Sequence, residues 1–537
     1  MRKLPIGIQT FSEIIEEHYT YVDKTGMAVD LVENGKYYFL SRPRRFGKSL
    51  FISTLQALFE GRRELFQGLA AHDRWDWSVQ YPVIKLSFAG VARTVADMKQ
   101  DIENILRRNQ NRLKVTCQRT EDIGGCLQEL IEKSFQKYGR KVAILVDEYD
   151  KPILDNLDQV DMAREAREIL KDLYTTIKDC DEFIKFAFLT GVSKFARVSV
   201  FSGLDNLKDI TLDRRYATIC GYRRIDLQTV FAEHLQGADQ EKIREWCNGY
   251  NFLGESVYNP FDILLFIDSG CIYDNYWFTT GTPTFLIKLI QQQNYFVPNL
   301  SNLWVNSSLI DSFDIEKIQI EPVLFQAGYL TIGKVREKKR GGYEFLLREP
   351  NKEVQISFND ILIDFLTGQR TEKNRYQDTL YNLFESADLE SLRGALTALF
   401  ASIPYNNYVN NTIASYEGYF ASVIYVYLAS LGLDIIGEDV TSRGRIDLTV
   451  RFGDNIYILE FKVDGQGRAI EQVRQKNYHQ KYMGEGKNIY LIGIDFSSAE
   501  KNISSFDHHL NGSMCESLVT GVCHSSSLSS VSFPRNQ

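Results

Sequence analysis

The sequence lacks the features that mark membrane-spanning and secreted proteins. No run of about 18 apolar residues occurs, because the richest stretch, residues 421–436, is interrupted by Ser422, Ser430 and Asp434. The amino terminus, Met1 to Pro5, also lacks the apolar core of a secretory signal. The sequence therefore predicts a cytoplasmic protein with no membrane partner.

Paired cysteines and an excess of basic residues are missing as well. The eight cysteines include no C-x-x-C pair, in a chain far longer than a disulfide scaffold, so we expect most of them to be reduced and buried. The formal net charge of -8 excludes a generally basic surface, so any binding of nucleic acid must be local. Potential zinc ligands gather near the end of the chain, but their spacing fits no recognised zinc site: His508, His509, Cys515, Cys523 and His524.

The sequence does contain the material for several domains. A chain of 537 residues is too long for one hydrophobic core and suggests roughly three or four domains. In the first part of the chain, apolar and β-branched runs alternate with helical periods, at 36–40, 83–88, 142–146 and 183–189. This alternation predicts an α/β fold with a parallel sheet covered by helices.

The middle of the chain predicts a helical region followed by a winged helix. Residues 225–300 have mostly helical patterns. A short helix is expected over 321–328, because Pro322 suits its first turn and Gly328 its end. A strand, a basic turn and a second strand follow, at 329–335, 338–342 and 343–347. The basic residues 338–340 could contact nucleic acid, although a solvated hairpin tip is the commoner explanation.

A loop suited to binding phosphate follows the first predicted strand. It reads SRPRRFGKS at 41–49 and leads into an apolar helical run at 50–59. In such a loop the amides face the phosphates, the lysine reaches the terminal phosphates and the serine hydroxyl ligates magnesium. Lys48 and Ser49 would have these roles. Arg42 stands where the usual pattern has glycine, while Arg44 and Arg45 add positive charge for a triphosphate.

Two carboxylates with a complementary role follow the third predicted strand. The apolar run 142–146 leads into Asp147, which could hold magnesium, and Glu148, which could activate the attacking water. The strand 183–189 ends near Ser193, whose hydroxyl could sense the γ-phosphate. Each motif alone could be an ordinary helix start or turn, but their order and placement favour a nucleotide site.

Four motifs carry a resemblance to a known family: YVDKT at 21–25, SRPRRFGKSL at 41–50, DEYD at 147–150 and TGVSKF at 190–195. Through them, residues 6–211 resemble the AAA-ATPase-like family of bacterial and archaeal genomes, in which the arginine-proline loop is the usual form. Residues 246–250 and 276–283 look like that family's helical lid. The resemblance implies ATP binding and hydrolysis with Mg²⁺, and leaves the arginine finger open among Arg197, Arg214 and Arg215. We expect these residues to contact the nucleotide: Arg44, Arg45, Phe46, Gly47, Lys48, Ser49, Asp147 and Ser193.

A second constellation of charged residues lies near the end of the chain, on two predicted strands. If Gly453 and Asp454 form a two-residue hairpin turn, counting outward places Asp447 directly opposite Glu460. Cross-strand Cβ atoms lie about 4.5 to 5.5 Å apart, so these carboxylates could share a divalent cation that offsets their repulsion. Lys462 falls on the same face as Glu460, where an ammonium could orient water or stabilise charge on phosphate.

Two helical residues complete this candidate site. Glu417 begins an apolar helical stripe, and a carboxylate on such a stripe needs a partner, for which magnesium is one candidate. Gln472 lies on a helix expected over 469–482 and could reach the same pocket. Alternatively, Asp447 and Glu460 could be solvated residues of a charge ladder and Glu417 a salt-bridge partner. The consistent geometry favours the site.

Glu417, Asp447, Glu460, Lys462 and Gln472 match, in order, the helix acid, the aspartate, the (D/E)-x-K pair and the polar helix position of the PD-(D/E)XK nuclease superfamily. Residues 416–494 resemble the subgroup of that superfamily that is commonly fused to the ATPase family. The resemblance implies cleavage of DNA with Mg²⁺ or Mn²⁺, in genome defence or mobile-element biology. The alternative is an ATP-driven switch or interaction protein whose nuclease fold binds nucleic acid or a partner without cutting. The oligomeric state stays open, a homo-oligomer included.

Together these patterns divide the chain into six expected segments. They are an AAA-ATPase-like P-loop domain (1–211), a helical lid (212–300), a winged-helix-like domain (301–370), a helical connector (371–402), a PD-(D/E)XK nuclease-like domain (403–500) and a disordered Ser-rich tail (501–537). The tail departs from the compact ending of the resembled family, which leaves open a shifted reading frame or a replaced terminus.

Overall fold

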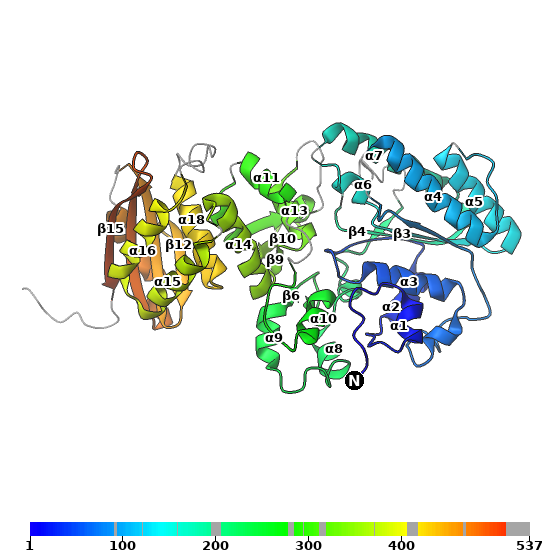
Figure 1. The fold of residues 1–537 in the computed structure, drawn as a ribbon, viewed down its shortest axis with the longest axis horizontal. Helices are drawn as coiled ribbons and strands as arrows, with labels where there is room; N and C mark the ends of the chain where they lie inside the picture. Colours follow the sequence, from blue (N-terminus) through cyan, green and yellow to red (C-terminus); the bar gives the residue numbers. More distant parts are fainter. Residues whose placement is uncertain are drawn as a thin grey trace, which may run out of the picture.

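A computed structural model of the chain forms an elongated molecule, in which three α/β units follow one another (Figure 1). It describes residues 1–90, 94–120, 122–157, 159–194, 206–277, 284–293, 295–310, 318–369, 371–404, 417–464 and 469–511. In these ranges no helix has the length and apolar character needed to cross a membrane.

The first unit is built on a five-stranded sheet of parallel strands in the order β2-β3-β4-β1-β5. The strands are β1 (Tyr37–Ser41), β2 (Val83–Ser87), β3 (Val142–Asp147), β4 (Ile184–Gly191) and β5 (Lys208–Asp209). The first four confirm the predicted runs to within a residue or two. They are rich in buried apolar residues because a parallel sheet with helices on both faces is buried on both sides.

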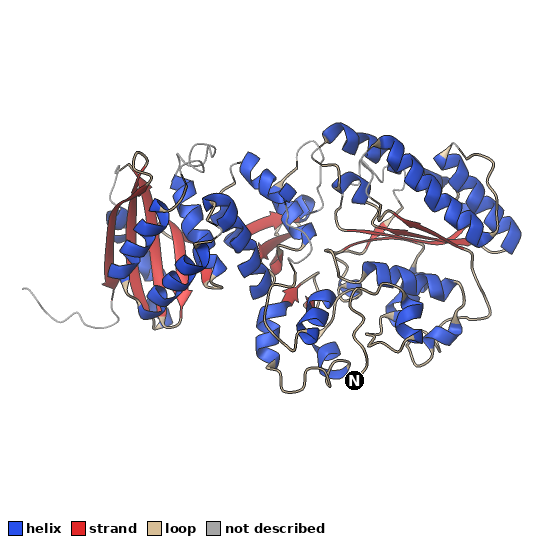
Figure 2. Ribbon diagram, viewed as in Figure 1, coloured by secondary structure: helices blue, strands red, loops and turns tan. Residues whose placement is uncertain are grey.

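Helices cover both faces of this sheet, as Figure 2 shows. Ala143 and Leu145 of β3 pack in the cluster of the first helical layer, while Ile144 and Val146 pack in that of the second. The first layer contains α1 (Phe11–Glu16), α2 (Thr25–Asn34) and α3 (Lys48–Phe59). The second contains α4 (Val95–Leu113), α5 (Ile123–Tyr138), α6 (Lys151–Leu154) and α7 (Val160–Asp179).

The segment predicted to be a helical lid follows, and it contains short helices and a hairpin. Its elements are α8 (Arg224–Thr229), α9 (Gln240–Cys247), a short hairpin of β6 (Asn248–Tyr250) and β7 (Val257–Tyr258), and α10 (Pro260–Asp268). The segment ends earlier than expected. Helix α11 (Thr284–Gln292), which the sequence placed in the lid, packs against α13 (Ile320–Ala327) of the next unit.

The second unit, from α11 to β10, has the element order of a winged helix, and we call it the winged-helix-like unit. After α11 come η4 (Val297–Asn302), β8 (Leu303–Asn306), α12 (Ser307–Ile310), α13, β9 (Thr331–Glu337) and β10 (Tyr343–Arg348). The strands form an antiparallel sheet in the order β8-β10-β9. Gly328 ends α13 with a φ of 91°, a left-handed conformation that glycine adopts without strain.

The third unit contains a second five-stranded sheet, in the order β11-β12-β13-β14-β15. Its elements are α14 (Lys352–Thr367), α15 (Lys373–Ser386), α16 (Leu389–Ala401), α18 (Glu417–Ser430), β11 (Asp434–Thr441), β12 (Gly444–Phe452), β13 (Asn455–Val463), α19 (Ala469–Lys476), β14 (Asn488–Ser497) and β15 (Asn502–Asn511). Strands β13 and β14 are parallel, and the other pairs are antiparallel.

Three expectations for this unit need correction. The predicted connector forms α15 and α16, which pack on the sheet: Tyr457 Oη donates a hydrogen bond to the Phe384 carbonyl at 2.6 Å. The predicted disordered tail begins with strand β15, which carries His508 and His509 along the sheet edge. The helix expected over 469–482 ends at Lys476. Residues 512–537, with Cys515, Cys523 and His524, lie outside the described residues.

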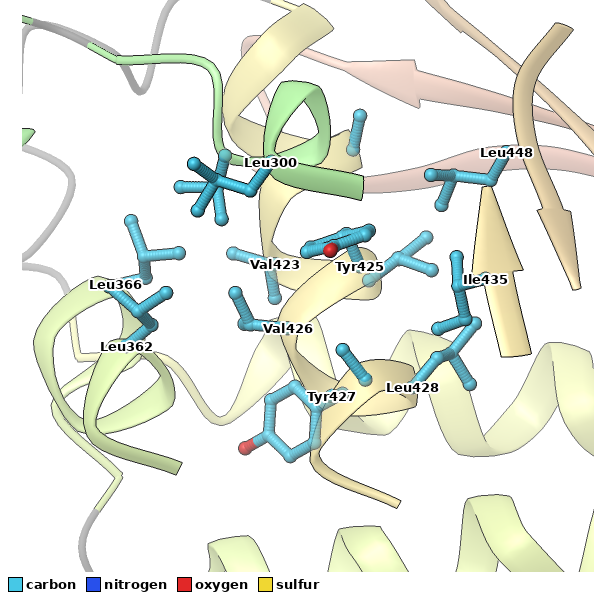
Figure 3. Packing of buried hydrophobic residues seen from close by; sticks show 14 of the residues in the cluster. Leu300, Leu362, Leu366, Val423, Tyr425, Val426, Tyr427, Leu428, Ile435 and Leu448 are labelled. Carbon is cyan, nitrogen blue, oxygen red and sulfur yellow. The ribbon is translucent and has the colours of Figure 1, made fainter. Parts of the chain in front are cut away.

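The winged-helix-like unit and the third unit share one hydrophobic core. Figure 3 shows helix α18 between Leu300 of η4 and Leu366 of α14 on one side and Ile435 and Leu448 of the sheet on the other. All of these side chains are buried. A continuous buried core ties its elements together, because separating them would expose apolar surface to water.

Candidate functional site

The predicted phosphate loop connects β1 to α3, with Gly47 at the helix start. Gly47 has a φ of 89°, which a residue with a side chain adopts only under strain. Lys48 is 8% exposed, and its ammonium donates to the carbonyls of Arg42 and Pro43, both at 2.9 Å. Burial lowers the pKa of Lys48, while Asp147 acts in the opposite direction. The lysine thus lies folded over the loop, beside the carboxylate expected to hold magnesium.

Arg42, in the place of the usual glycine, anchors the loop from beneath. Its guanidinium donates to the carbonyls of Thr211 at 2.8 Å and Tyr216 at 3.1 Å, and lies 3.8 Å from the centre of the Phe252 ring. Burial lowers its pKa to about 10. Phe46, which the sequence placed at the nucleotide, is buried with its ring centre 4.8 Å from that of Tyr250. Its ring therefore fixes the loop to the lid hairpin.

Asp147 and Glu148 lie at the carboxyl end of β3. The Oδ1 atom of Asp147 is buried and has no hydrogen-bond partner among the residues described, so a cation has an oxygen ligand to take up there. Glu148 has a φ of 54°, in the left-handed region. Burial, and then the charge of Asp147, raise its pKa, which suits a group that accepts a proton from water.

Ser193 is oriented differently from expectation. Its hydroxyl donates to Asp150 Oδ2 at 2.6 Å, and the same oxygen accepts the N–H groups of Val192 at 3.0 Å and Ser193 at 2.6 Å. Asp150 thus orders the tip of β4. Sequence analysis gave it no role, although it stands in the DEYD motif two residues from Glu148.

These elements enclose a cavity of about 500 Å³. It is lined by the loop residues Arg44, Arg45, Gly47, Lys48 and Ser49, by Glu148 and Asp150, by the amino-terminal Pro5, Gly7, Ile8 and Gln9, and by Phe261 and Leu264 of α10. A volume of this size suits a nucleotide. Two of the arginine-finger candidates, Arg214 and Arg215, lie in the short turn η3 (Arg214–Tyr216), where Arg215 pairs with Asp213. The third, Arg197, lies outside the described residues.

Behind Arg45, two carboxyl groups lie buried at the contact between the lid and α14. Asp262 and Glu353 are each 2% exposed, and Glu353 Oε1 accepts the N–H groups of Tyr276 at 2.8 Å and Trp277 at 2.9 Å. Burial raises the pKa of Glu353 from its usual 4.5 to about 7. Burial and the neighbouring Glu353 raise the pKa of Asp262 well above its usual value.

This pair gives a testable pH dependence. Between pH 4.5 and about 7 the folded protein binds more protons than the unfolded chain, so its stability should fall as pH rises through that window. Glu353→Gln keeps a side-chain oxygen that can accept both N–H groups. It should reduce the loss in free energy of unfolding across that pH window by up to roughly 3 kcal/mol. Thermal unfolding at several pH values measures it, with Glu385→Gln at an exposed position of α15 as the control. The same dependence of thermal stability on pH in wild type and Glu353→Gln would contradict this prediction.

The second candidate site forms where β12 and β13 part. Their register follows the predicted turn, with Phe452 opposite Asn455 and Leu448 opposite Leu459. Beyond this last pair, Asp447 Oδ2 accepts the Phe461 N–H at 2.7 Å. The ladder between the strands ends there, one pair before the predicted pair of Asp447 and Glu460, so the two acids lie at the same end of the hairpin but are not a paired position of the sheet.

Glu460 is the most buried acid of this site, at 1% exposed. Its Oε1 accepts hydrogen bonds from Lys462 Nζ at 3.3 Å and from Gln472 Nε2. Its Oε2 is buried and finds no hydrogen-bond partner within the described ranges. Burial, and then Asp447, raise the pKa of Glu460 to about 8, and burial raises that of Asp447 to about 6. Burial thus disfavours the charged form of both acids, and more strongly that of Glu460.

Lys462 supplies positive charge at the centre of the site. Its ammonium lies 3.5 Å from Glu417 Oε1, 3.3 Å from Glu460 Oε1 and 2.7 Å from its own neighbour's carbonyl at Phe461. Across the part of the chain that the structure describes, no three His, Cys, Asp or Glu side chains stand ready-made as a metal site. The carboxylate oxygens and the orphaned Oε2 of Glu460 nonetheless fit the ligands that Mg²⁺ and Mn²⁺ prefer.

Sequence analysis missed a fourth acid, Glu438 of β11. Gly437 pairs with Leu448 and Asp439 with Ile446, so Glu438 lies opposite Asp447 in the register between them. It has a φ of 52° and forms an ion pair with Arg445. Its charge contributes to the raised pKa of Asp447. The register counted from the turn at Gly453 concerns only β12 and β13. Glu438 could have been found only from the pairing of β11 with β12.

Comparisons with known proteins agree with the two predicted domain types. Residues 5–201 match a family model described as "Predicted AAA-ATPase", and residues 415–506 match one described as "PD-(D/E)XK nuclease superfamily". A protein of Azotobacter chroococcum mcd 1, named "Uncharacterized protein in vnfD 5'region", is 47% identical over 510 residues, covering 94% of this chain and 98% of that protein. No solved structure matches the chain. The chain therefore belongs to the family of that Azotobacter protein, with an AAA-ATPase-like domain followed by a PD-(D/E)XK nuclease superfamily domain.

Proposed function

We propose that this protein hydrolyses ATP and uses the nucleotide to control a metal-dependent nuclease that cuts DNA. The observation that carries the proposal is the convergence of Asp447, Glu460 and Lys462 at the end of one hairpin, in a chain that also places Lys48 and Glu148 on one cavity. The biological setting that we propose, genome defence or mobile-element biology, comes from the family resemblance.

In the nucleotide site, each residue has a distinct role. Lys48 exchanges its bonds to the loop carbonyls for the terminal phosphates, while Ser49 and Asp147 hold Mg²⁺. Glu148 orients the attacking water and accepts its proton. Arg44 and Arg45, which line the same cavity, add positive charge beside the phosphates.

In the nuclease site, Glu417, Asp447 and Glu460 would hold Mg²⁺ or Mn²⁺. A divalent cation there offsets the repulsion between the acids and stabilises charge that develops on the phosphate. Lys462 places an ammonium beside the reacting phosphate. Gln472, through its hydrogen bond to Glu460, keeps that carboxylate in place.

One observation favours the alternative, an ATP-driven switch whose nuclease fold binds without cutting. Lys462 already lies within 3.5 Å of both Glu417 and Glu460. Part of the negative charge of the site is thereby balanced without a metal, as a purely structural ion-pair cluster would require. Cleavage assays separate the two functions, because only the nuclease cuts DNA.

Purified protein should cut DNA only in the presence of a divalent cation. We expect cleavage of at least one of linear, circular and single-stranded DNA in Mg²⁺ or Mn²⁺, faster with ATP, and none after chelation, because acids that repel each other need the metal. Gel electrophoresis of the products measures it. DNA binding without cleavage of any substrate would favour the switch, and cleavage in excess chelator would refute the metal site.

A further inference from the structure

Strand β11, which carries Glu438, contacts the winged-helix-like unit through Gly437, the residue before Glu438. The Gly437 N–H donates to Ser301 Oγ at 2.6 Å, and the same hydroxyl donates to the Pro298 carbonyl at 2.9 Å. A Cβ on Gly437 would lie 2.4 Å from the Pro298 oxygen, so only glycine permits this approach. Segment η4 is therefore in direct contact with β11 where the backbone turns into the left-handed conformation of Glu438.

The helix that carries Glu417 touches the same part of the chain. Gly418, the second residue of α18, lies against Phe296, and a Cβ on it would be 3.2 Å from the phenylalanine ring. Phe296 directly precedes η4. Two acids of the proposed nuclease site, Glu417 and Glu438, thus each adjoin a glycine that packs on one short segment.

This contact is rigid, because the segment is part of the shared core. Val297 and Leu300 are each 1% exposed and pack in the cluster that contains Tyr425 of α18 and Ile435 of β11 (Figure 3). Close-packed interiors transmit displacements, since side chains have little free volume to absorb them. A movement of the winged-helix-like unit would shift η4 together with the backbone beside both acids.

The other side of the winged-helix-like unit contacts the loops of the nucleotide site. The Lys194 N–H, just after Ser193, donates to Gln326 Oε1 of α13 at 2.9 Å. Gly328, at the end of α13, approaches the phosphate loop so closely that a Cβ on it would lie 2.8 Å from Pro43 Cβ. Helix α13 therefore touches two loops that ATP would contact or reorder.

We propose that η4 is the link through which the nucleotide site acts on the nuclease site, with Ser301 as the residue that positions Glu438 beside Asp447. This inference rests on the proposed nuclease function. ATP shifts the loops at Pro43 and Lys194, the winged-helix-like unit follows as one body, and the Ser301 hydroxyl carries the shift to the backbone of Glu438. Ser301 is a positioning residue, because it reaches the site only through Gly437.

The test compares Ser301→Ala with Ser301→Thr, which keeps the hydroxyl. We expect Ser301→Ala to weaken Mn²⁺ binding at the C-terminal site by about 10-fold, the lower end of the effect of losing a contact outside the ligands, because Glu438 lies beside the proposed ligand Asp447. Isothermal titration calorimetry of the full chain measures this affinity. The binding event at the C-terminal site is identified as the one that Asp447→Ala removes. The cleavage assay should need correspondingly more Mn²⁺, and its stimulation by ATP should fall toward none, while basal ATP hydrolysis stays unchanged.

Two further variants keep the test decisive. Ser386→Ala removes a hydroxyl that donates to its own helix at 2.8 Å and should behave as wild type. If Ser301→Ala unfolds, Gly418→Ala should weaken Mn²⁺ binding by pressing α18 against Phe296. Wild-type Mn²⁺ binding and full ATP stimulation in Ser301→Ala would overturn the proposal. If wild type cuts no DNA, the nuclease function fails, while the Mn²⁺ titration still decides whether Ser301 positions the site.

Discussion

Lys48→Ala should abolish ATP hydrolysis by the purified protein, with a loss of at least about 100-fold, the usual effect of removing one charge-stabilising donor from a transition state. Lys48 is buried against the phosphate loop and lines the cavity. Alanine removes the positive charge that would meet the terminal phosphates. Release of phosphate at saturating ATP measures the effect.

The companion variant, Glu148→Gln, separates binding from hydrolysis. Glutamine keeps the size of the side chain but cannot take a proton from water, so hydrolysis should stop while ATP still binds. Titration with a fluorescent ATP analogue measures the affinity, which should stay within a few-fold of wild type. Glu168→Gln, on an exposed face of α7, is the matched control. Undiminished turnover in both Lys48→Ala and Glu148→Gln would show that the nucleotide site lies elsewhere.

Asp447→Ala and Lys462→Ala should each stop DNA cleavage, by about 100-fold or more, and leave basal ATP hydrolysis nearly intact. Asp447→Ala removes the carboxylate that we propose as a metal ligand, together with its hydrogen bond from the Phe461 N–H. Lys462→Ala removes the ammonium between Glu417 and Glu460. The two sites belong to different units of the fold, so hydrolysis has no direct dependence on either residue. Initial rates of cleavage and of phosphate release on the same preparation measure both.

The control for this pair is Asp434→Ala, an acid on the same sheet whose side chain is 64% exposed. It should cut DNA at the wild-type rate. Cleavage by Asp447→Ala at the wild-type rate would remove this hairpin from the catalytic centre.

Much of the fold follows from local sequence pattern. The four long strands of the first sheet were predictable because each consists mainly of apolar residues, which burial on both faces favours. The hairpin register was predictable because a two-residue turn at Gly453 and Asp454 sets the pairs outward from it, as far as Leu448 opposite Leu459, the pair next to Asp447 and Glu460.

Long-range packing explains what the sequence concealed. Strand β15 is an edge strand in which polar residues predominate. Its own sequence pattern does not indicate a strand, because that strand forms only by pairing with β14. Helices α15 and α16 are amphipathic, which predicts a buried face but not which sheet covers it. Glu438 reaches the nuclease site through pairing of β11 to β12, and Phe46 turns into the lid because Tyr250 and Phe252 are there.

The central claim is that a nucleotide site controls a nuclease site in the same chain. The most direct test is the rate of DNA cleavage in Mg²⁺, with and without ATP, by wild type, Lys48→Ala and Glu148→Gln. Wild type should cut faster with ATP, Glu148→Gln should keep that stimulation because it holds ATP, and Lys48→Ala should lose it. Cleavage rates that are the same with and without ATP in wild type and in both variants would contradict the claim.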